Sequence, residues 1–379
     1  MDFKVLQERS KMQNEAKDAV RAAGYVASLL VTVGGGKGKV IIDLAQEILE
    51  KYKIKRVLYV YDNRRLRDST VEGFPQELQK WASPELRRIV QCECYQTAYK
   101  FRDQEYDLLL SDEADFGLTP EYCKVFFNNK FRFKILVTGT LAPTKKKLLE
   151  SIAPIVYKLT TNNAEDRGII NKTKYYIYNF RMTESESREY LNWNMRIAKA
   201  MAAEKSPQHI NYVLGQRKEL LYSLESSQVH TRKVMDWLWR NNKQTRLIIF
   251  CERTAQADRV CKWSYHGKNA SDDNLTKFQN GEISGLAVVG KIKRGINLKN
   301  ANTAIFKDLS GTSTTEFEQR NGRMKRLKTS EIGTTIFMVP WYKKLDEEGE
   351  TIWKPTIVDD WIYKATLNLK GIHFENLKL

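Results

Sequence analysis

The sequence predicts an α/β fold of two tandem lobes, each a mainly parallel sheet flanked by helices. Short, continuously apolar runs recur along the chain, and a helical pattern follows most of them. Apolar runs of five or six residues that alternate with helices are typical of strands buried in a parallel sheet. The length of 379 residues fits about two domains of ordinary size.

The expected strands fall into two groups, one in each half of the chain. They lie at residues 29–33, 56–61, 107–112, 134–139, 246–251, 285–290, 303–309 and 334–339. We assign residues 1–165 to the first lobe and residues 166–379 to the second. The second lobe is expected to open with a helical lead-in over residues 183–240.

The lead-in carries a helix start and an apolar stripe. Thr183 and Glu186 have the spacing of a capping box, in which each side chain satisfies a backbone amide at the other residue. Apolar residues then follow at helical period: Tyr190, Trp193, Ile197 and Met201. These side chains could stack on bases, but a stripe at this period indicates a buried helix face, and we interpret it as core.

The charge balance favours a polyanionic partner. Lysine and arginine number 63 against 46 aspartate and glutamate residues, which leaves a net charge of +17. Such an excess suits nucleic acid, because neutralised phosphates release their counterions. A membrane surface, or solubility alone, is the alternative interpretation of the charge.

The chain lacks the features of a membrane-spanning or secreted protein. No apolar run approaches the ~20 residues needed to cross a bilayer, and the charged start MDFKVLQERS is unlike a secretory signal. The five cysteines are scattered and complete no metal-ligand set, so we interpret them as thiols in a reducing compartment. We therefore expect a cytoplasmic protein.

A glycine-rich loop follows the first expected strand. The segment VGGGKG places Gly34, Gly35, Gly36 and Lys37 between that strand and a helical pattern. The backbone amides of such a loop hold phosphate oxygens, and the lysine reaches the β- and γ-phosphates. A plain strand-to-helix turn is the alternative. Gly38 stands where phosphate loops carry a serine or threonine whose hydroxyl binds Mg²⁺.

A pair of carboxylates ends another expected strand. The run DLLLSDEAD places Asp112 and Glu113 directly behind an apolar stretch. An aspartate at a strand end beside a phosphate loop can hold Mg²⁺, and an adjacent glutamate can polarise the attacking water. Surface charge is the alternative, and the apolar strand before the pair argues against it. The loop and the pair together predict a site for ATP and Mg²⁺.

Segments of the chain resemble, in order, the motifs of the superfamily 2 helicases and translocases. They are MQNEAKDAV (12–20), VGGGKG (33–38), SDEAD (111–115), VTGTLAP (137–143), LIIFCERTAQAD (247–258), VGKIKRGINLKNAN (289–302) and QRNGRMKR (319–326). The last segment fits the arginine-rich motif VI at every fixed position. The resemblance covers nearly the whole chain and implies two tandem RecA-like lobes that couple ATP hydrolysis to movement on nucleic acid.

The resemblance implies a role at the nucleotide for each matched position. The implied nucleotide contacts are Gln13, Gly34, Gly35, Gly36, Lys37, Gly38, Gly295, Gln319 and Arg320. Asp112 would hold Mg²⁺ and Glu113 would polarise the attacking water. Arg323 and Arg326 would stabilise the γ-phosphate charge that builds in the transition state, as planar cations supplied by the second lobe.

The resemblance also implies a nucleic-acid groove coupled to the nucleotide. Thr138 and Thr140 would relay the nucleotide state to that groove. The expected contacts with nucleic acid are Asn63, Arg64, Arg65, Tyr95, Gln96, Thr97, Arg253 and Thr254. Contacts of this kind reach phosphate and sugar, so binding should be independent of base sequence and weakened by salt. Solvent-facing loop polarity is the alternative for each residue.

Three features favour DNA over RNA and a phage-type helicase. Gln319 opens the arginine-rich segment, where the DEAD-box RNA helicases normally carry histidine, and it is more like the DNA repair and recombination branch. Residues 153–170 and 265–286 are similar to stretches of phage and repair helicases, and the chain is close to two bare lobes. Residues 342–355 read like a hairpin and are our candidate for a strand-separating element.

Other functions stay open beside the helicase. Gly38 allows water to complete the Mg²⁺ shell, slow hydrolysis, or nucleotide binding without turnover. The intact set of charged residues favours a working ATPase. The alternatives are a double-strand translocase or branch-migration enzyme, an RNA helicase, and a nucleotide-gated nucleic-acid-binding protein.

Overall fold

The computed structural model consists of two α/β units, Met1–Asn171 (unit 1) and Lys172–Leu379 (unit 2). It describes residues 3–62, 76–268, 273–289, 298, 301–309, 314–322, 332–367 and 374–377. The predicted boundary after residue 165 falls inside helix α10 (Thr161–Asp166). Ile169 and Ile170 pack in the core of unit 1, which is why that unit extends beyond the predicted boundary.

Unit 1 is built on a six-stranded sheet in the order β3-β2-β4-β5-β1-β6, with every neighbouring pair parallel. Its strands are β1 (Val26–Val31), β2 (Val57–Tyr61), β3 (Val90–Cys94), β4 (Glu105–Ser111), β5 (Lys130–Thr138) and β6 (Ile155–Leu159). The sequence predicts four of them. It misses β3 and β6, whose residues are less completely buried.

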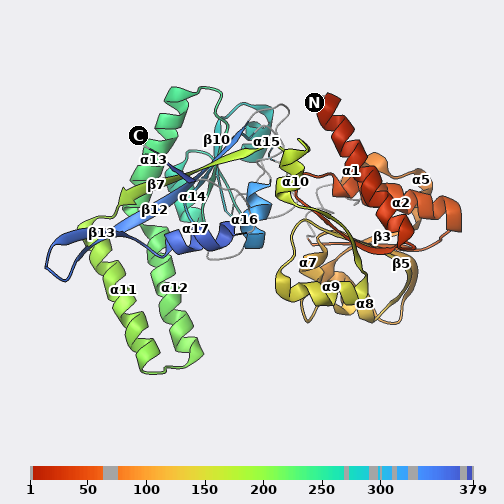
Figure 1. Ribbon diagram of the computed structural model, residues 1–379, viewed down its shortest axis with the longest axis horizontal. Helices are drawn as coiled ribbons and strands as arrows, with labels where there is room; N and C mark the ends of the chain where they lie inside the picture. Colours follow the sequence, from red (N-terminus) through yellow and green to blue (C-terminus); the bar gives the residue numbers. More distant parts are fainter. Residues whose placement is uncertain are drawn as a thin grey trace. The chain divides into compact units, whose positions relative to one another are not determined.

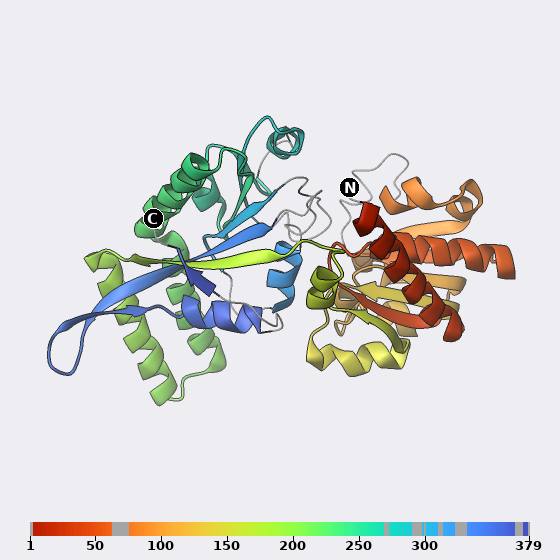
Figure 2. The same cartoon turned by 45° about the horizontal axis from the view of Figure 1, so that its top comes forward.

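Helices pack on both faces of the unit 1 sheet (Figures 1 and 2). They are α1 (Phe3–Ala22), α2 (Lys37–Tyr52), α4 (Gln76–Trp81), α5 (Pro84–Ile89), α6 (Tyr95–Ala98), α7 (Ala114–Gly117), α8 (Lys124–Phe127), α9 (Lys146–Ile152) and α10, with a 3₁₀ turn at Pro143–Lys145. Along β2, Val57 and Tyr59 face the core beneath α1 and α2, whereas Leu58 and Val60 face the opposite core beneath α8 and α9. Burial on both faces explains the continuously apolar runs.

Unit 2 contains a larger sheet of eight described strands. Seven follow the order β14-β7-β12-β11-β8-β10-β9, and β13 pairs with β12. The strands are β7 (Thr173–Arg181), β8 (Leu247–Phe250), β9 (Ser264–Tyr265), β10 (Gly285–Val288), β11 (Thr303–Phe306), β12 (Gly333–Leu345), β13 (Thr351–Pro355) and β14 (Phe374–Asn376). All pairs are parallel except β12 with β13. Two sheets of this kind, flanked by helices, confirm the predicted fold class.

The unit 2 helices also form two cores, one on each face of the sheet. They are α11 (Glu184–Ala202), α12 (Pro207–Ser223), α13 (Glu225–Asn241), α14 (Thr254–Val260), α15 (Asp273–Asn280), α16 (Thr314–Asn321) and α17 (Val358–Thr366). α13 and α14 cover one face, while α15, α16 and α17 cover the other. None of the helices in the described part of the chain has both the length and the apolar character needed to cross a lipid bilayer.

The helical lead-in is α11 to α13, and its stripe is only partly core. Thr183 and Glu186 form the predicted capping box. Tyr190 and Ile197 are buried, but Met201 is 52% exposed, which corrects the prediction for that residue. α11 and α12 run side by side away from the sheet (Figures 1 and 2), so the far end of α11 has no sheet to pack against. The sequence does not predict β7, which precedes the lead-in.

The segment expected to form a hairpin does so. β12 continues past the sheet and turns back through Gly349, whose φ is 83°, into β13. Trp341 lies opposite Pro355, and Leu345 opposite Thr351.

Candidate functional site

The glycine loop connects β1 to α2 and contains two glycines in left-handed conformations. Gly34 has a φ of 91° and Gly36 a φ of 86°. Such conformations cost other L-residues about 1–2 kcal/mol. Gly36 directly precedes α2, so the helix begins at Lys37. The first backbone amides of α2 and the positive end of its dipole can therefore hold an anion at this turn.

Close packing around the loop explains its glycines and places Gln13 beside it. A Cβ atom at Gly35 would lie 2.7 Å from Val31 Cγ1. One at Gly36 would lie 2.8 Å from Gln13 Nε2. Helix α1 thus brings Gln13, an expected nucleotide contact, against the expected phosphate loop.

Replacing Gly36 by alanine is expected to lower the free energy of unfolding by about 1–2 kcal/mol. The left-handed backbone conformation is unfavourable for alanine, and the added Cβ atom displaces Gln13. Urea unfolding followed by circular dichroism measures the change. The matched control is Gly215→Ala, in the interior of α12, where a Cβ meets nothing within 4 Å. In that control the free energy of unfolding should rise by about 0.5–1 kcal/mol, because alanine favours the interior of a helix more than glycine does. Equal stability of Gly36→Ala and the parent would contradict the expectation.

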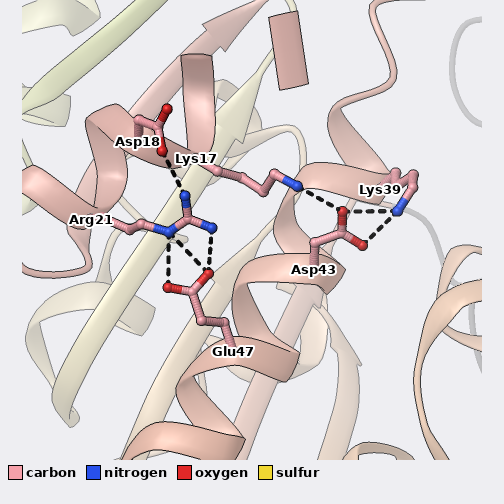
Figure 3. Close-up of polar contacts among 6 residues, drawn as sticks. All are labelled: Lys17, Asp18, Arg21, Lys39, Asp43 and Glu47. Atoms are coloured by element: carbon pink, nitrogen blue, oxygen red, sulfur yellow. Dashed lines mark hydrogen bonds and ion pairs between the residues drawn. The ribbon is translucent and has the colours of Figure 1, made fainter. Parts of the chain in front are cut away.

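Ion pairs hold α1 on α2, as Figure 3 shows. Asp43 accepts hydrogen bonds from Lys17 Nζ at 3.3 Å and from Lys39 Nζ at 2.7 Å. One turn further along α2, Glu47 Oε2 accepts from Arg21 Nη2 at 2.7 Å. The helix that carries Gln13 is therefore fixed in register with the helix that begins at the loop.

Lys37 lies between the two predicted carboxylates. Its Nζ donates to Glu113 Oε1 at 2.5 Å and is 3.6 Å from Asp112 Oδ1. The Lys37 side chain is only 16% exposed. Burial lowers the pKa of Lys37, but the charges of Glu113 and Asp112 outweigh it and the net pKa is raised. The lysine is thus a charged group at the end of the loop, where it can meet phosphate oxygens.

The backbone at Asp112 and Glu113 is tightly specified. The Asp112 amide donates to Val60 O at 2.9 Å, and Asp112 Oδ1 accepts the Glu113 amide at 3.0 Å. Glu113 has a φ of 48°, a left-handed conformation that costs a non-glycine residue about 1–3 kcal/mol. This turn directs both carboxylates to Lys37 at the carboxyl end of the sheet.

The donor groups at this turn are compatible with Mg²⁺ bound together with a nucleotide. In such sites one or two carboxylates share the ion with phosphate oxygens and water. Among the described residues no group of three or more metal-ligating side chains occurs. Asp112 is the residue that we expect to hold the ion. Gly38 lies in the first turn of α2 and adds no hydroxyl.

The two threonines expected to couple the sites lie next to the acidic segment. Thr138 Oγ1 is 2.9 Å from Asp115 Oδ1 and 2.7 Å from Thr140 O. Both threonines are buried. Lys145 Nζ donates to Asp115 O at 2.7 Å. Asp115, whose role the sequence does not predict, therefore joins the end of β5 to the turn that carries Asp112 and Glu113.

The expected contacts after β3 divide into one core residue and two surface residues. Tyr95 is fully buried, and its hydroxyl lies 2.6 Å from Ser111 Oγ. The prediction that Tyr95 contacts nucleic acid at the surface is therefore wrong. The polar residues next to Tyr95 in the sequence do not indicate that its ring is buried in the core. Gln96 and Thr97 are half-buried. Gln96 Nε2 donates to Asp62 O at 3.2 Å, at the carboxyl end of β2.

In unit 2, Arg320 is a buried residue with a partner in the same unit. It is 3% exposed, and its Nη2 lies 2.7 Å from Glu252 Oε1. Its guanidinium also lies 5.6 Å from the centroid of the Phe250 ring. Arg320 therefore joins α16 to the end of β8 within unit 2, and its expected contact with the nucleotide stays a prediction.

The two expected contacts after β8 lie at the start of α14. Arg253 is exposed, and its guanidinium pairs with Glu219 and lies 5.3 Å from the centroid of the Tyr222 ring. Thr254 is half-buried at the first position of the helix. Both lie at the carboxyl end of the sheet.

Several expected site residues lie outside the described residues: Asn63, Arg64, Arg65, Gly295, Arg323 and Arg326. Only the backbone of Gln319 is described, as part of α16. The roles of these residues stay predictions.

A buried ion pair, which the sequence analysis does not predict, lies at the end of β11. Lys307 Nζ lies 2.9 Å from Asp308 Oδ1, and both side chains are at most 1% exposed. Asp308 Oδ2 accepts the Glu252 amide at 3.1 Å. Burial raises the pKa of Asp308, against the pull of Lys307. The pair lies beside the Arg320–Glu252 contact, and two charges directly after an apolar strand are the signal that could have indicated it.

Three solved structures have a similar fold. Yeast (S. cerevisiae) Dbp5 bound to RNA and ADP BeF3 matches 100% of this chain and 94% of its own, with a TM-score of 0.59 and 13% identity. The Pyrococcus furiosus Hef helicase domain matches 86% of this chain and 94% of its own, with a TM-score of 0.52 and 12% identity. A putative HsdR subunit fragment from Vibrio vulnificus YJ016 matches 91% and 69%, with a TM-score of 0.58 and 15% identity. At these identities the likeness shows the fold, which is that of tandem RecA-like lobes.

Part of unit 2 also matches a protein family at the level of sequence. Residues 229–328 match the family model of the helicase conserved C-terminal domain. The matched segment includes β8, β11 and the arginine-rich residues 319–326. No curated protein matches the sequence. The family match and the fold together support a superfamily 2 helicase or translocase.

Proposed function

We propose that the protein is an ATP-dependent helicase or translocase of superfamily 2 that acts on DNA in the cytoplasm. The observation that carries the proposal is the contact of Lys37, at the end of the glycine loop, with Glu113 at 2.5 Å and Asp112 at 3.6 Å. A phosphate-binding turn, a cation and two carboxylates are the groups that phosphoryl transfer to water requires.

The groups of unit 1 divide the chemistry between them. The amides at the start of α2 and Lys37 bind the β- and γ-phosphates. Mg²⁺, held beside Asp112 and the phosphates, would neutralise charge on the transferred group. Glu113 accepts a proton from the attacking water. ATP competes with Glu113 for Lys37, so nucleotide binding releases the glutamate to act as a base.

Unit 2 would supply the remaining charge. Arg323 and Arg326 stand at the positions of an arginine finger and would stabilise the γ-phosphoryl group as it leaves. Hydrolysis would then require both units, and repeated closure and opening would move the protein along a strand. Support comes from the helicase family match across these residues, and from Dbp5, which was solved with RNA and ADP BeF3.

Coupling to nucleic acid would pass through the end of β5. Thr138 Oγ1 contacts the acidic segment at Asp115, and it also contacts the carbonyl oxygen of Thr140. Gln96 and Thr97 lie at the carboxyl edge of the same sheet, and Arg253 and Thr254 at that of unit 2. A shift of the Asp112–Asp115 turn on nucleotide binding would therefore be passed to the carboxyl edge of the unit 1 sheet, where Gln96 and Thr97 lie.

A DNA substrate and a phage-type branch are the finer parts of the proposal. Gln319 at the start of the arginine-rich segment supports DNA over RNA. Saturating single-stranded DNA and RNA of one base sequence, compared as activators of phosphate release, test this part. We expect the stronger stimulation from DNA. Equal or stronger stimulation by RNA would overturn it.

Strand separation and double-strand translocation are distinguished by substrate. The β12–β13 hairpin is the proposed wedge. A forked duplex and a triplex, assayed side by side with ATP, separate the two functions. Release of the forked strand supports a helicase, whereas displacement of only the third strand of the triplex supports a double-strand translocase.

Gly38 favours one further candidate, a nucleotide-gated nucleic-acid-binding protein without turnover. The position lacks the hydroxyl that would ligand Mg²⁺. Magnesium retains several water ligands readily, so we propose that water fills that place. ATP-dependent DNA affinity without phosphate release would establish the alternative.

A further inference from the structure

Cations gather at the amino ends of the strands in unit 1, at the edge of the sheet opposite to the glycine loop. Lys55 and Arg56 directly precede β2, and Arg88 lies just before β3. Val57 pairs with Val90 in parallel register, so the three cations meet at one edge. β2 has five residues, which at ~3.3 Å each separate the two edges of the sheet by about 17 Å.

These cations border a hollow of about 270 Å³, whose lining also includes Gln91 and Tyr106. The Arg56 guanidinium lies 4.7 Å from the centroid of the Tyr106 ring. The Tyr106 hydroxyl donates to Gln91 Oε1 at 3.0 Å. Arg56 Nη2 also donates to Gln104 Oε1 at 3.5 Å. A guanidinium placed on an aromatic face keeps its remaining in-plane N–H groups for acceptors such as phosphate oxygens.

The carboxylates nearest to the hollow have other partners. Asp107 Oδ2 accepts the backbone amides of Lys55 at 2.7 Å and Arg56 at 3.0 Å. Glu105 pairs with Lys130 at 2.8 Å. Within the described part of the chain, none of the three cations at the hollow forms an ion pair. Glu85 interacts electrostatically with Arg88, and Glu105 with Arg56, so carboxylates nearby reduce the positive charge at the hollow without pairing with it directly.

Further cations continue along the same edge. Lys53 follows α2, and Lys130 and Arg132 lie at the start of β5. The register of Glu105 with Lys130 places the start of β5 beside the start of β4. We define the amino-edge basic surface as Lys53, Lys55, Arg56, Arg88, Lys130 and Arg132. In sheet order it crosses β3, β2, β4 and β5.

We propose that the amino-edge basic surface binds the phosphodiester backbone of DNA, as a second contact outside the groove at the carboxyl edge. The inference rests on the proposed function, because the surface would bind another segment of the same DNA substrate. A row of cations with few free carboxylates complements a polymer that carries a charge at every nucleotide. The DNA segment bound here is the one that extends past the groove.

The shape of the surface favours a polymer over a small anion. Small-molecule sites enclose most of their ligand and are mainly apolar. Here Lys55, Arg56, Arg88 and Gln91 are all exposed, and the hollow continues into a charged edge. A backbone lying across it would contact several cations in succession without being enclosed.

The test is a triple charge reversal, Lys55→Glu with Arg56→Glu and Arg88→Glu. Affinity for single-stranded oligonucleotides of increasing length is measured by fluorescence anisotropy at several salt concentrations. For long oligonucleotides we expect the affinity to fall on the order of 10- to 100-fold. The slope of log affinity against log salt concentration should become shallower by roughly 2 to 3, because three phosphate contacts are lost. Short oligonucleotides, which fill only the groove, should bind as before, and basal ATP hydrolysis should be unchanged.

A matched control separates the site from net charge. Lys233→Glu with Arg240→Glu and Lys243→Glu alters the net charge equally on exposed residues in and after α13. Equal losses in the two variants, or no loss at long oligonucleotides, would overturn the inference. If the triple variant does not fold, Arg88→Glu alone is used, with one lost contact expected.

The outcomes also separate this inference from the proposed function. A parent protein that binds no nucleic acid refutes both. A parent protein that DNA stimulates, with a triple variant that binds long DNA normally, refutes only the second contact. Binding of the parent to vesicles containing phosphatidylserine, lost in the variant while DNA affinity stays intact, would assign the surface to lipid instead.

Discussion

Replacing Glu113 by glutamine is expected to slow phosphate release from ATP by about 10²- to 10⁴-fold, the usual contribution of a general base. Glutamine has nearly the same shape but cannot take a proton from the attacking water. ATP should bind at least as tightly as to the parent, because Lys37 Nζ loses the charge of its partner at 2.5 Å and becomes more available to phosphate. DNA binding should be retained.

Steady-state phosphate release with Mg²⁺ and binding of a fluorescent ATP analogue measure the two effects separately. Glu121→Gln is the matched control, since Glu121 is an exposed glutamate of the same unit. Hydrolysis by Glu113→Gln at the rate of the parent would show that the base has been assigned to the wrong residue. Loss of ATP binding together with hydrolysis would indicate a structural role for Glu113.

Replacing Arg323 by alanine is expected to lower the turnover of ATP by about 10³- to 10⁵-fold, the range for loss of an arginine finger. The charge it supplies matters most in the transition state, so ATP affinity should change far less than turnover. Arg323→Lys should restore little, because an ammonium lacks the planar pair of donors that a guanidinium presents to phosphate.

Lys325→Ala is the matched control for this variant, since Lys325 is a cation of the same segment at a variable position of the motif. It should retain turnover within a few-fold of the parent. Equal losses in Arg323→Ala and Lys325→Ala would show that the segment acts through its overall charge. Unchanged turnover in Arg323→Ala would show that Arg323 takes no part in the chemistry.

The parts of the fold that the sequence predicts are those buried on both faces of a sheet. β2 and β8 are continuously apolar, and this pattern predicts both strands. The sequence does not predict β7, because Lys174, Asn179 and Arg181 interrupt its apolar residues. This holds even though β7 lies inside the sheet, between β14 and β12. β3 alternates and lies at the edge of its sheet. The signal for a strand thus depends on its burial rather than on its place in the sheet.

The candidate site shows a similar limit. The loop at Lys37 and the pair at Asp112 and Glu113 could be predicted, because each requires particular residue types at a strand end. Burial could not be read from the same patterns. Tyr95 and Arg320 stand among polar neighbours, yet one packs inside unit 1 and the other pairs with Glu252 inside unit 2. A motif indicates that a residue matters and leaves open whether it contacts a ligand or supports a neighbour.

The most direct test of the central claim, that the protein uses ATP to move on nucleic acid, is the rate of phosphate release from Mg²⁺·ATP as single-stranded DNA is titrated to saturation. We expect a rate that rises with DNA to a plateau and that Glu113→Gln abolishes. A rate that saturating nucleic acid leaves unchanged, or no phosphate release above background in any condition, would contradict it.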